Sequence, residues 1–331
     1  MPTIVRFHQL GGPDVLRFEE ISSQQQPGEG EVRLRVQASG LNRAESLYFH
    51  GRYFEQPQLP SRLGYEAAGI VEAVGDGVDR SWLGKSVATV PGFSQNRYGI
   101  LGEEAIVPAA ALGEYPANLK PTEAAAIWMQ YLTAYGALVH FGTVAAGDFV
   151  SIPAASSSVG LAAIQIVRDS GGTAIAVTRT SAKREELLSL GAHHVIASEE
   201  EDYVAKVQQI AGGRGVRLTF DPVAGSFVEK LAAASTPGGV IFEYGSLSGE
   251  STAFPLATAI GRGLALRGYS VLEITSKPAA LKTATKYIFD RLASGRFVPK
   301  IAKVFPFAQT VEAYKYLESN QQVGKVVIGI E

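Results

Sequence analysis

This chain of 331 residues contains no cysteine. Disulfides, thiolate zinc sites, iron–sulfur clusters and a cysteine nucleophile are therefore excluded. A surplus of charge of one sign is also missing, because 30 Lys and Arg stand against 32 Asp and Glu, which gives a net charge of −2. No basic field is available to hold nucleic acid or an anionic membrane, so we expect neither as a partner.

Long hydrophobic runs are missing as well. Polar or charged residues interrupt every apolar segment before it reaches the length of a membrane span. Residues 1–16 (MPTIVRFHQLGGPDVL) predict a strand and a turn, and they lack the apolar stretch of a signal peptide. A composition of 46% hydrophobic and 19% charged residues is typical of a globular protein. We therefore expect a globular protein located in the cytoplasm.

The first third of the chain predicts a β-rich domain, and the overall length favours two domains. Val32 to Val36 (VRLRV) alternates apolar and polar residues, as a half-buried strand does. Similar short runs recur between turn signals such as Gly75-Asp76-Gly77, and they cover residues 69–74, 85–90 and 104–107. Short strands at this spacing indicate a barrel or a sandwich.

The pattern changes near Glu123, where strands and helices begin to alternate. Residues 123–139 (EAAAIWMQYLTAYGALV) show the apolar spacing of a helix. Further helices are predicted at 159–170 and 182–190, and six strands at 149–153, 173–178, 194–197, 216–221, 240–244 and 265–269. Such a series predicts a doubly wound parallel sheet with helices on both faces. The tail returns to mixed structure, with helices at 278–294 and 311–319 and a strand at 325–330.

Residues 150–163 (VSIPAASSSVGLAA) combine a buried strand, a loop of small residues and a helix. Ala154, Ser157 and Gly160 stand where a dinucleotide-binding loop has its three glycines. Small residues there allow a tight turn, close approach of a pyrophosphate to backbone N–H groups, and packing of the helix on the strand. An ordinary strand–helix turn with serine caps is the alternative. The predicted cofactor contacts are Ala155, Ser156, Ser157, Ser158, Val159 and Gly160.

The end of the next strand indicates which dinucleotide is bound. An NAD site usually has Asp or Glu there to hold the ribose hydroxyls. This sequence has Thr178, Arg179 and Lys183 instead, with no carboxylate before Glu185. Arg179 and Lys183 suit a 2′-phosphate, which an acid would repel. The sequence therefore predicts NADPH, with a solvated basic helix start as the alternative.

Motifs along nearly the whole chain resemble those of the medium-chain dehydrogenase/reductases, in their zinc-independent quinone oxidoreductase branch. The matching segments are Gly11-Gly12-Pro13 with Val15-Leu16, then 38–42 (ASGLN), 51–53 (GRY), 63–71 (LGYEAAGIV), 74–78 (VGDGV), 132–135 (LTAY), the phosphate loop, 190–192 (LGA) and 220–223 (FDPV). The resemblance implies an α/β protein with a GroES-like β-rich domain plus a Rossmann domain built on a doubly wound parallel sheet. It implies residues 1–123 and 271–331 for the first domain, 124–270 for the second, and an active site in the cleft between them.

Zinc-containing relatives in this superfamily carry Cys, His and Cys where this chain has Asn42, Tyr65 and Met129. An amide, a phenol and a thioether cannot form the thiolate–imidazole site of those relatives. The four-cysteine lobe that binds structural zinc is also absent. We therefore expect no metal in the reaction.

Without zinc, a carbonyl oxygen that gains negative charge during hydride transfer needs hydrogen-bond donors. The resemblance points to Asn42 and Tyr53 as donors, with Asn42 also orienting the substrate or the nicotinamide ribose. Tyr65 and Tyr131 are reserve donors, although any one tyrosine taken alone is better explained as a packing residue. The remaining predicted cofactor contacts are Thr133, Gly245, Ser246 and Lys325.

Together these features predict an NADPH-dependent oxidoreductase that transfers hydride to a small quinone or α,β-unsaturated carbonyl without zinc. Two alternatives stay open: an enoyl-thioester reductase acting on a carrier-bound acyl chain, and a non-catalytic NADPH-binding redox sensor. The sixth strand of the parallel sheet leaves an edge that can pair across a two-fold axis, as in the family. We therefore also expect a homodimer.

Overall fold

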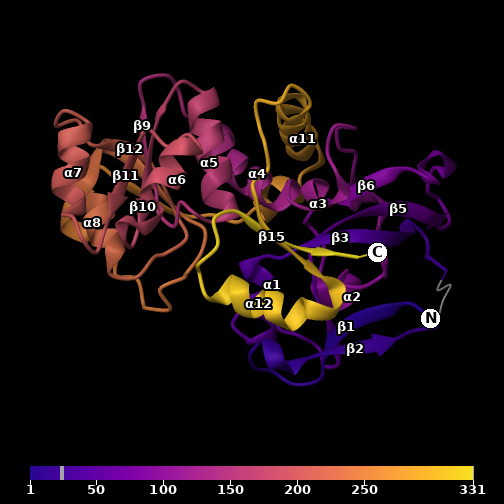
Figure 1. Cartoon of the computed structure of the whole chain (residues 1–331). Coiled ribbons are helices and arrows are strands. Elements are labelled where there is room, and N and C mark those ends of the chain that lie inside the picture. Colours follow the sequence, from indigo (N-terminus) through magenta and orange to yellow (C-terminus); the bar gives the residue numbers. More distant parts are fainter. Residues whose placement is uncertain (23–25, 331) are drawn as a thin grey trace. The chain divides into compact units, whose positions relative to one another are not determined.

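The computed structural model describes residues 1–22 and 26–330 and contains two compact units (Figure 1). Unit 1 consists of Met1–Met129 and Pro278–Glu331, and unit 2 consists of Gln130–Lys277. The domain limits predicted from the sequence lie a few residues before both of these divisions. Unit 1 is discontinuous in sequence, and its two segments join in one sheet.

Unit 1 is built on two sheets. The larger has seven strands in the order β15-β16-β3-β5-β6-β8 with β7 paired to β3, and the smaller has the order β2-β1-β4. The strands are β1 (Thr3–Phe7), β2 (Leu16–Glu20), β3 (Glu31–Gly40), β4 (Ser61–Arg62), β5 (Glu66–Val74), β6 (Ser86–Thr89), β7 (Glu104–Pro108), β8 (Leu112–Gly113), β15 (Ile301–Pro306) and β16 (Lys325–Gly329). The helices are α1 (Arg43–Phe49), α2 (Gln95–Tyr98), α3 (Pro121–Ala124), α11 (Pro278–Ala293) and α12 (Thr310–Glu318).

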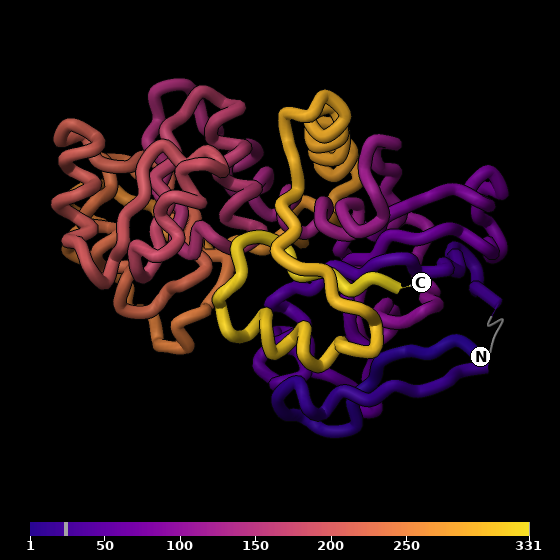
Figure 2. Tube along the Cα trace, in the orientation of Figure 1, coloured from indigo at the N-terminus to yellow at the C-terminus, as the bar shows by residue number. Residues whose placement is uncertain are grey.

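The C-terminal segment completes this unit. Strand β16 lies antiparallel to β3, with Val327 opposite Gly40, and β15 runs parallel to β16. Figure 2 shows the yellow C-terminal segment beside the dark blue N-terminal part of the chain. This pairing brings Lys325, at the start of β16, to the end of β3, and so to the residues that follow β3 in sequence.

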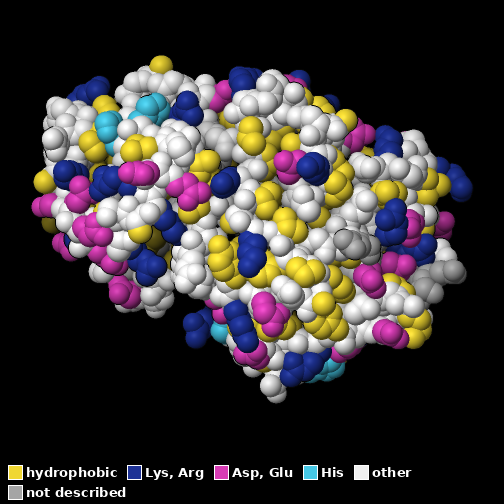
Figure 3. Space-filling view, in the orientation of Figure 1, with side chains coloured by type: hydrophobic (Ala, Val, Ile, Leu, Met, Phe, Trp, Pro, Cys, Tyr) yellow, Lys and Arg dark blue, Asp and Glu magenta, His cyan; other side chains and the backbone are white. Residues whose placement is uncertain are grey.

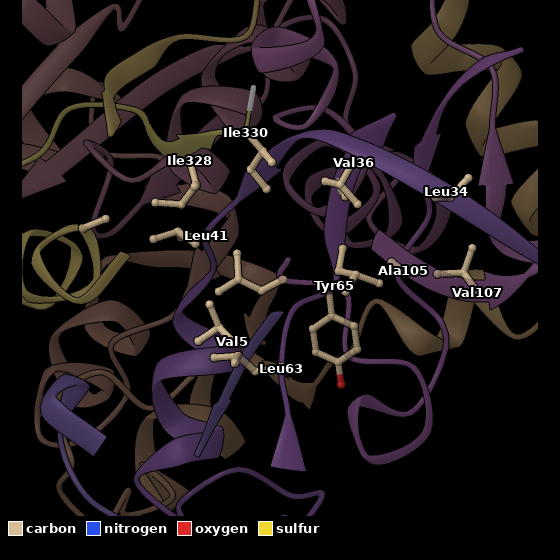
Figure 4. Packing of buried hydrophobic residues seen from close by; sticks show 14 of the residues in the cluster. Val5, Leu34, Val36, Leu41, Leu63, Tyr65, Ala105, Val107, Ile328 and Ile330 are labelled. Atoms are coloured by element: carbon tan, nitrogen blue, oxygen red, sulfur yellow. The ribbon is translucent and has the colours of Figure 1, made fainter. Parts of the chain in front are cut away.

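Alternating strand residues fill the core of unit 1. Along β3, Val32, Leu34 and Val36 are buried while the residues between them are more exposed. Burying a side chain of this size contributes about 1.5–3 kcal/mol. Figure 4 shows aliphatic side chains of β3, β7 and β16 gathered with the ring of Tyr65, whose hydroxyl points away from them. The ring of Tyr65 thus packs in the core, while its hydroxyl can make polar contacts.

Unit 2 contains a six-stranded sheet in the order β11-β10-β9-β12-β13-β14, and its strand pairs are parallel. The strands are β9 (Phe149–Ile152), β10 (Thr173–Thr178), β11 (His194–Ala197), β12 (Val216–Asp221), β13 (Ser235–Glu243) and β14 (Ala265–Gly268). The helices include α5 (Ser158–Asp169), α6 (Arg184–Ser189), α7 (Tyr203–Ile210), α8 (Phe227–Ala234), α9 (Leu256–Arg262) and α10 (Leu272–Thr275). The predicted six-stranded parallel sheet is confirmed, although its fifth strand begins earlier than predicted.

The helical structure predicted at 123–139 is confirmed in part, because most of these residues are helical but they do not form one continuous α-helix. Its pieces are α3, α4 (Trp128–Tyr135) and the π-helical segment η4 (Gly136–Phe141). Close packing is found at both joints between these pieces. The carbonyl of Ala125 occupies the space that a side chain on Gly40 would need, and the Tyr269 hydroxyl does the same at Gly136. These contacts come from distant strands, so helical periodicity alone does not contain them.

The surface is mixed in character. Basic and acidic side chains are interspersed over the face drawn in Figure 3, with apolar side chains between them. Within the described ranges, no helix combines the length and the apolarity needed to cross a membrane.

Candidate functional site

The predicted phosphate loop lies between β9 and α5 in unit 2. Ser157 is the N-cap of α5, and its Oγ accepts a hydrogen bond from the N–H of Gly160 at 3.0 Å. Ala154 adopts a left-handed backbone with φ +49°. This conformation favours glycine, so the position keeps the geometry of the first glycine in the template without the residue. The serine-cap alternative therefore holds for Ser157, within a loop that also has the sharp turn of a dinucleotide site.

Close packing explains the glycine that the loop retains. A Cβ on Gly160 would lie 2.7 Å from the backbone of Ala155, so any side chain would push the helix away from the loop. The N–H of Ala155 donates to the carbonyl of Val177 at 3.2 Å, so this residue shapes the loop. Ser156, Ser158 and Val159 are partly exposed at the helix start. A helix N-terminus offers unpaired N–H groups and a positive dipole end to an anion.

The basic end of β10 folds onto this loop. The Nζ of Lys183 donates to Ser156 Oγ at 3.1 Å, although 27 positions separate the two residues. Burial, followed by the nearby charge of Arg179, lowers the pKa of Lys183. Arg179 is exposed, and Thr178 donates through its Oγ1 to the carbonyl of Thr180 at 2.8 Å. Two cations and a serine hydroxyl thus gather at the strand end, where a 2′-phosphate site is predicted.

The other predicted cofactor residues of unit 2 lie outside the phosphate loop and the basic strand end. Gly245 and Ser246 are exposed directly after β13, and a Cβ on Gly245 would lie 2.8 Å from the carbonyl of Pro222. Thr133 lies on α4 and is 7% exposed. Tyr131, a reserve donor, is fully buried and its hydroxyl donates to Gln165 Oε1 at 3.1 Å. Tyr131 is therefore a core residue whose hydroxyl already has a partner.

In unit 1, both the nitrogen and the oxygen of the Asn42 side-chain amide have hydrogen-bond partners. Its Nδ2 donates to the carbonyl of Gly40 and to Glu45 Oε1, each at 3.1 Å. Its Oδ1 accepts from Lys325 Nζ at 2.6 Å. Both N–H bonds are therefore engaged, so the predicted donation from this amide to a substrate would require the contacts to Gly40 or Glu45 to open. The second lone pair of Oδ1 is the part of the group still able to contact a ribose hydroxyl.

Lys325 forms a buried ion pair within this cluster. Its ammonium forms an ion pair with Glu66, and both side chains are 1% exposed. The other oxygen of Glu66 accepts the N–H of Met129 at 2.7 Å. Direct contact between this ammonium and a cofactor would require the cluster to open. Sequence analysis missed Glu66, although it lies within the resembling segment 63–71.

Glu45 is the second acid of the cluster that sequence analysis missed. It forms a capping box with Asn42 at the start of α1, and Oε1 also accepts the N–H of Tyr65 at 3.2 Å. Burial raises the pKa of Glu45 to about 7, and the charge of Lys325 opposes that rise. An Asn followed three residues later by Glu is the signal that could have predicted this box.

The positions that carry zinc ligands in relatives lie around this cluster, since Asn42 and Tyr65 contact Glu45, and Met129 contacts Glu66. Among the described residues, no group of three or more His, Cys, Asp or Glu side chains is arranged to hold a metal. In this cluster, Glu66 and Asn42 both contact the ammonium ion of Lys325.

Tyr53 and Tyr65 form a hydrogen-bonded pair of phenols. Burial raises the pKa of Tyr53 to about 12, against a lowering by its hydrogen bond with Tyr65. Burial also raises the pKa of Tyr65, and there the same hydrogen bond adds to the rise. Phe54 stacks on Tyr53 at 4.0 Å and Phe93 packs on Tyr65 at 5.6 Å, so the pair has an aromatic surround.

Comparisons with known proteins find relatives over nearly the whole chain. The family model for the alcohol dehydrogenase GroES-like domain matches residues 28–118, and the model for zinc-binding dehydrogenase matches residues 158–286. The chain is 30% identical to a 2-haloacrylate reductase of a Burkholderia species over 97% of both chains, and 30% identical to quinone oxidoreductase 1 of Escherichia coli K12 over 99% of both. It also resembles the crystal structure of E. coli quinone oxidoreductase complexed with NADPH, with a TM-score of 0.90, 28% identity and 99% of both chains covered.

Proposed function

This chain belongs to the zinc-independent quinone oxidoreductase branch of the medium-chain dehydrogenase/reductase superfamily, and from that premise we propose that it transfers hydride from NADPH to a quinone or an α,β-unsaturated carbonyl compound. The names of the relatives, a quinone oxidoreductase and a 2-haloacrylate reductase, support an acceptor in which an electron-poor double bond is conjugated to a carbonyl or carboxylate. The cytoplasmic location expected from the sequence stays a prediction.

The observation that carries the choice of cofactor is the contact between Lys183 and Ser156, which brings the basic strand end to the phosphate loop. In this proposal the start of α5 binds the pyrophosphate through backbone N–H groups and its dipole. Arg179 and Lys183 bind the 2′-phosphate, the first with a planar fork and the second as a point charge. Gly245 and Ser246 line the remainder of the dinucleotide site.

The chemistry needs one hydride and one proton. The bound nicotinamide supplies the hydride, and the carbonyl oxygen of the acceptor gains negative charge as the hydride arrives. Tyr53 donates a hydrogen bond, and finally its proton, to that oxygen through its phenol. A phenol with a pKa of about 12 keeps its proton at neutral pH, so it can donate a hydrogen bond to the developing negative charge. Water then restores the proton to Tyr53.

The direct test is NADPH consumption with a panel of acceptors: a para-quinone, an enone, a 2-haloacrylate and an enoyl thioester. Turnover of the first three is the expected result. Turnover of the thioester alone would favour the enoyl-thioester reductase alternative. Tight NADPH binding without turnover of any acceptor would favour the non-catalytic sensor, and absence of NADPH binding would contradict the proposal.

The role of Tyr53 predicts a specific kinetic defect. Tyr53→Phe removes the donor and keeps the ring, so we expect kcat/KM to fall at least about tenfold, as for loss of one oxyanion donor. Tyr98→Phe is the matched control, because Tyr98 lies in the same aromatic group but gives its hydroxyl to Glu31 at 2.8 Å. A Tyr53→Phe enzyme as active as Tyr98→Phe would rule out the proposed donor.

The homodimer is proposed on the basis of β14, which ends the sheet of unit 2. In the segment that precedes β14 in sequence, Phe254, Leu256 and Ile260 are 57%, 60% and 74% exposed. Two copies that pair their β14 edges across a two-fold axis would continue the sheet and cover these side chains.

The double variant Leu256→Glu/Ile260→Glu is expected to convert the dimer to a monomer of 35.1 kDa, because four charges would meet at the joined edges. Light scattering measures the mass. Leu188→Glu, on α6 and 43% exposed, is the control that should stay dimeric. A parent protein that is already monomeric, or a double variant that stays dimeric, would exclude this interface.

A further inference from the structure

The side chains of Asp221 and Glu243 form a pair of facing carboxyl groups, here named the carboxyl pair. Asp221 ends β12 and Glu243 ends β13, and the two are register partners on adjacent parallel strands. Register partners project from the same face of a sheet, so the two carboxyl groups are neighbours, and the charge of Asp221 acts on Glu243. Among the described residues, neither side chain forms an ion pair with a cation. The pair is therefore stable only while it holds a proton.

That proton belongs to Glu243. The two oxygens of Asp221 accept the N–H groups of Val223 and Ala224, each at 2.9 Å, which favours a charged carboxylate at Asp221. Both oxygens of Glu243 are shielded from solvent and accept no hydrogen bond from the described residues. Burial, then repulsion from Asp221, raises the pKa of Glu243 to about 8. Glu243 is thus expected to hold its proton at neutral pH, with the carboxylate of Asp221 beside it as an acceptor.

The carboxyl pair holds the loops at this edge of the sheet. Asp221 fixes the turn after β12, where Ala224 has a left-handed backbone with φ +58°. This turn supports the loop after β13, since Leu247 N–H donates to the Pro222 carbonyl at 2.9 Å and Ser248 N–H donates to the Val223 carbonyl at 3.0 Å. The supported loop contains Gly245 and Ser246, the predicted cofactor contacts. The proton of Glu243 therefore lies at the base of the cofactor loop.

We propose that protonated Glu243 is a positioning residue that keeps the loops after β12 and β13 in the form that binds NADPH, and that loss of its proton weakens cofactor binding. This inference rests on the proposed function, because it assigns the loop to the cofactor. Ionisation would leave two buried carboxylates in contact, and the turn at Val223 and Ala224 would have to move to separate or hydrate them.

Few other groups around the pair can change charge near neutral pH. Burial, and then the charge of Asp221, raises the pKa of Tyr244, which follows β13. Burial also raises the pKa of Tyr203 in α7, so both tyrosines stay neutral. Arg267 from β14 lies at the register position before the pair and forms an ion pair with Glu273 at 2.6 Å. Asp221 is the neighbour whose charge acts on Glu243. A change in NADPH affinity between pH 7 and pH 9 that depends on Glu243 would therefore indicate that Glu243 loses its proton in this range.

The test is a fluorescence titration of NADPH between pH 7 and pH 9 for the parent, Glu243→Gln and Glu250→Gln. The parent Kd is expected to rise about tenfold by pH 9, since a site that needs a proton of pKa about 8 loses occupancy in that proportion. Glu243→Gln keeps a donor to Asp221 but cannot ionise, so its Kd should change less than about twofold. Glu250→Gln is the matched control: it removes an exposed acid of the same loop region and should behave like the parent.

The outcomes separate the two proposals. A parent and a Glu243→Gln variant with the same pH dependence would overturn the role of Glu243 while leaving the proposed function intact. No NADPH binding at any pH would overturn the proposed function, and this inference with it. If Glu243→Gln does not fold, Glu243→Ala serves instead, because it also removes the titrating group and should show a pH-independent Kd.

Thermal unfolding without cofactor gives an independent reading of the same proton. The pKa of Glu243 is raised from 4.5 to about 8 in the folded protein, so the folded state holds a proton that the unfolded chain has released. Stability due to this group should fall as pH rises from about 4.5 to about 8 and then level off. The Tm advantage of Glu243→Gln over the parent should grow across that range, and a pH-independent difference would contradict the assignment of the proton to Glu243.

Discussion

Replacing Lys325 by methionine is expected to lower the free energy of unfolding by about 3–5 kcal/mol, the usual cost of removing one partner from a buried ion pair. The ammonium of Lys325 neutralises Glu66 and holds Asn42 Oδ1, and no solvent reaches the pair to replace it. Methionine fills much the same volume, so the loss would measure charge and hydrogen bonding more than a cavity. Urea unfolding measures the free energy.

Two further variants test whether the loss of stability comes from the buried ion pair. Lys315→Met removes a lysine whose partner Asp14 lies on the surface, so it should leave the free energy of unfolding almost unchanged. The double variant Lys325→Met/Glu66→Gln should recover part of the stability, because it removes the uncompensated carboxylate as well. A Lys325→Met protein within 1 kcal/mol of the parent would contradict the account of the buried cluster.

The cost of Lys325→Met should also depend on pH. Burial raises the pKa of Glu45 to about 7, and the charge of Lys325 limits that rise. Without the lysine, the pKa of Glu45 is expected to rise further, so Glu45 takes up a proton more readily as the pH falls and the buried negative charge is reduced. The loss of stability should therefore be smaller at pH 5 than at pH 8.

The elements that the sequence predicts well are those with local signals. The parallel strands of unit 2 are short apolar runs between turn residues, and the positions of β10 and β11 match the prediction. The basic strand end could be predicted because Arg179 and Lys183 stand where an acid is usual. The contact of Lys183 with Ser156 follows from the parallel pairing of β9 and β10, which brings their carboxyl ends together.

The features that the sequence did not predict depend on contacts between distant segments. Lys325 and Asn42 are 283 positions apart, and nothing near either residue indicates that the amide of Asn42 is already engaged. Glu243 stands inside the predicted strand 240–244, where an acid among apolar residues is a local anomaly. Its partner Asp221 becomes apparent only from the strand order β12-β13 and the register between them.

The double variant Arg179→Ala/Lys183→Ala is expected to weaken NADPH binding roughly 100-fold and to leave NADH binding within about twofold. Each charged hydrogen bond to a phosphate contributes about 1.5–3 kcal/mol, and loss of about 3 kcal/mol in all corresponds to this factor. NADH has no 2′-phosphate, so it serves as the control ligand for the loop itself. Fluorescence titration of both cofactors measures the two Kd values.

The structure adds a reason to expect such a large effect. Lys183 is half-buried beside Arg179, and both burial and the like charge of Arg179 lower its pKa, so the two cations oppose one another until an anion arrives. A bound 2′-phosphate would relieve that repulsion in addition to accepting hydrogen bonds. Lys206→Ala, on α7 of the same unit, removes a more exposed cation paired with Glu201 and should leave both affinities unchanged. If the double variant kept its preference for NADPH, this strand end would not be the 2′-phosphate site. If its affinity for both cofactors fell equally, Arg179 and Lys183 would support the loop through Ser156 and would not recognise the phosphate.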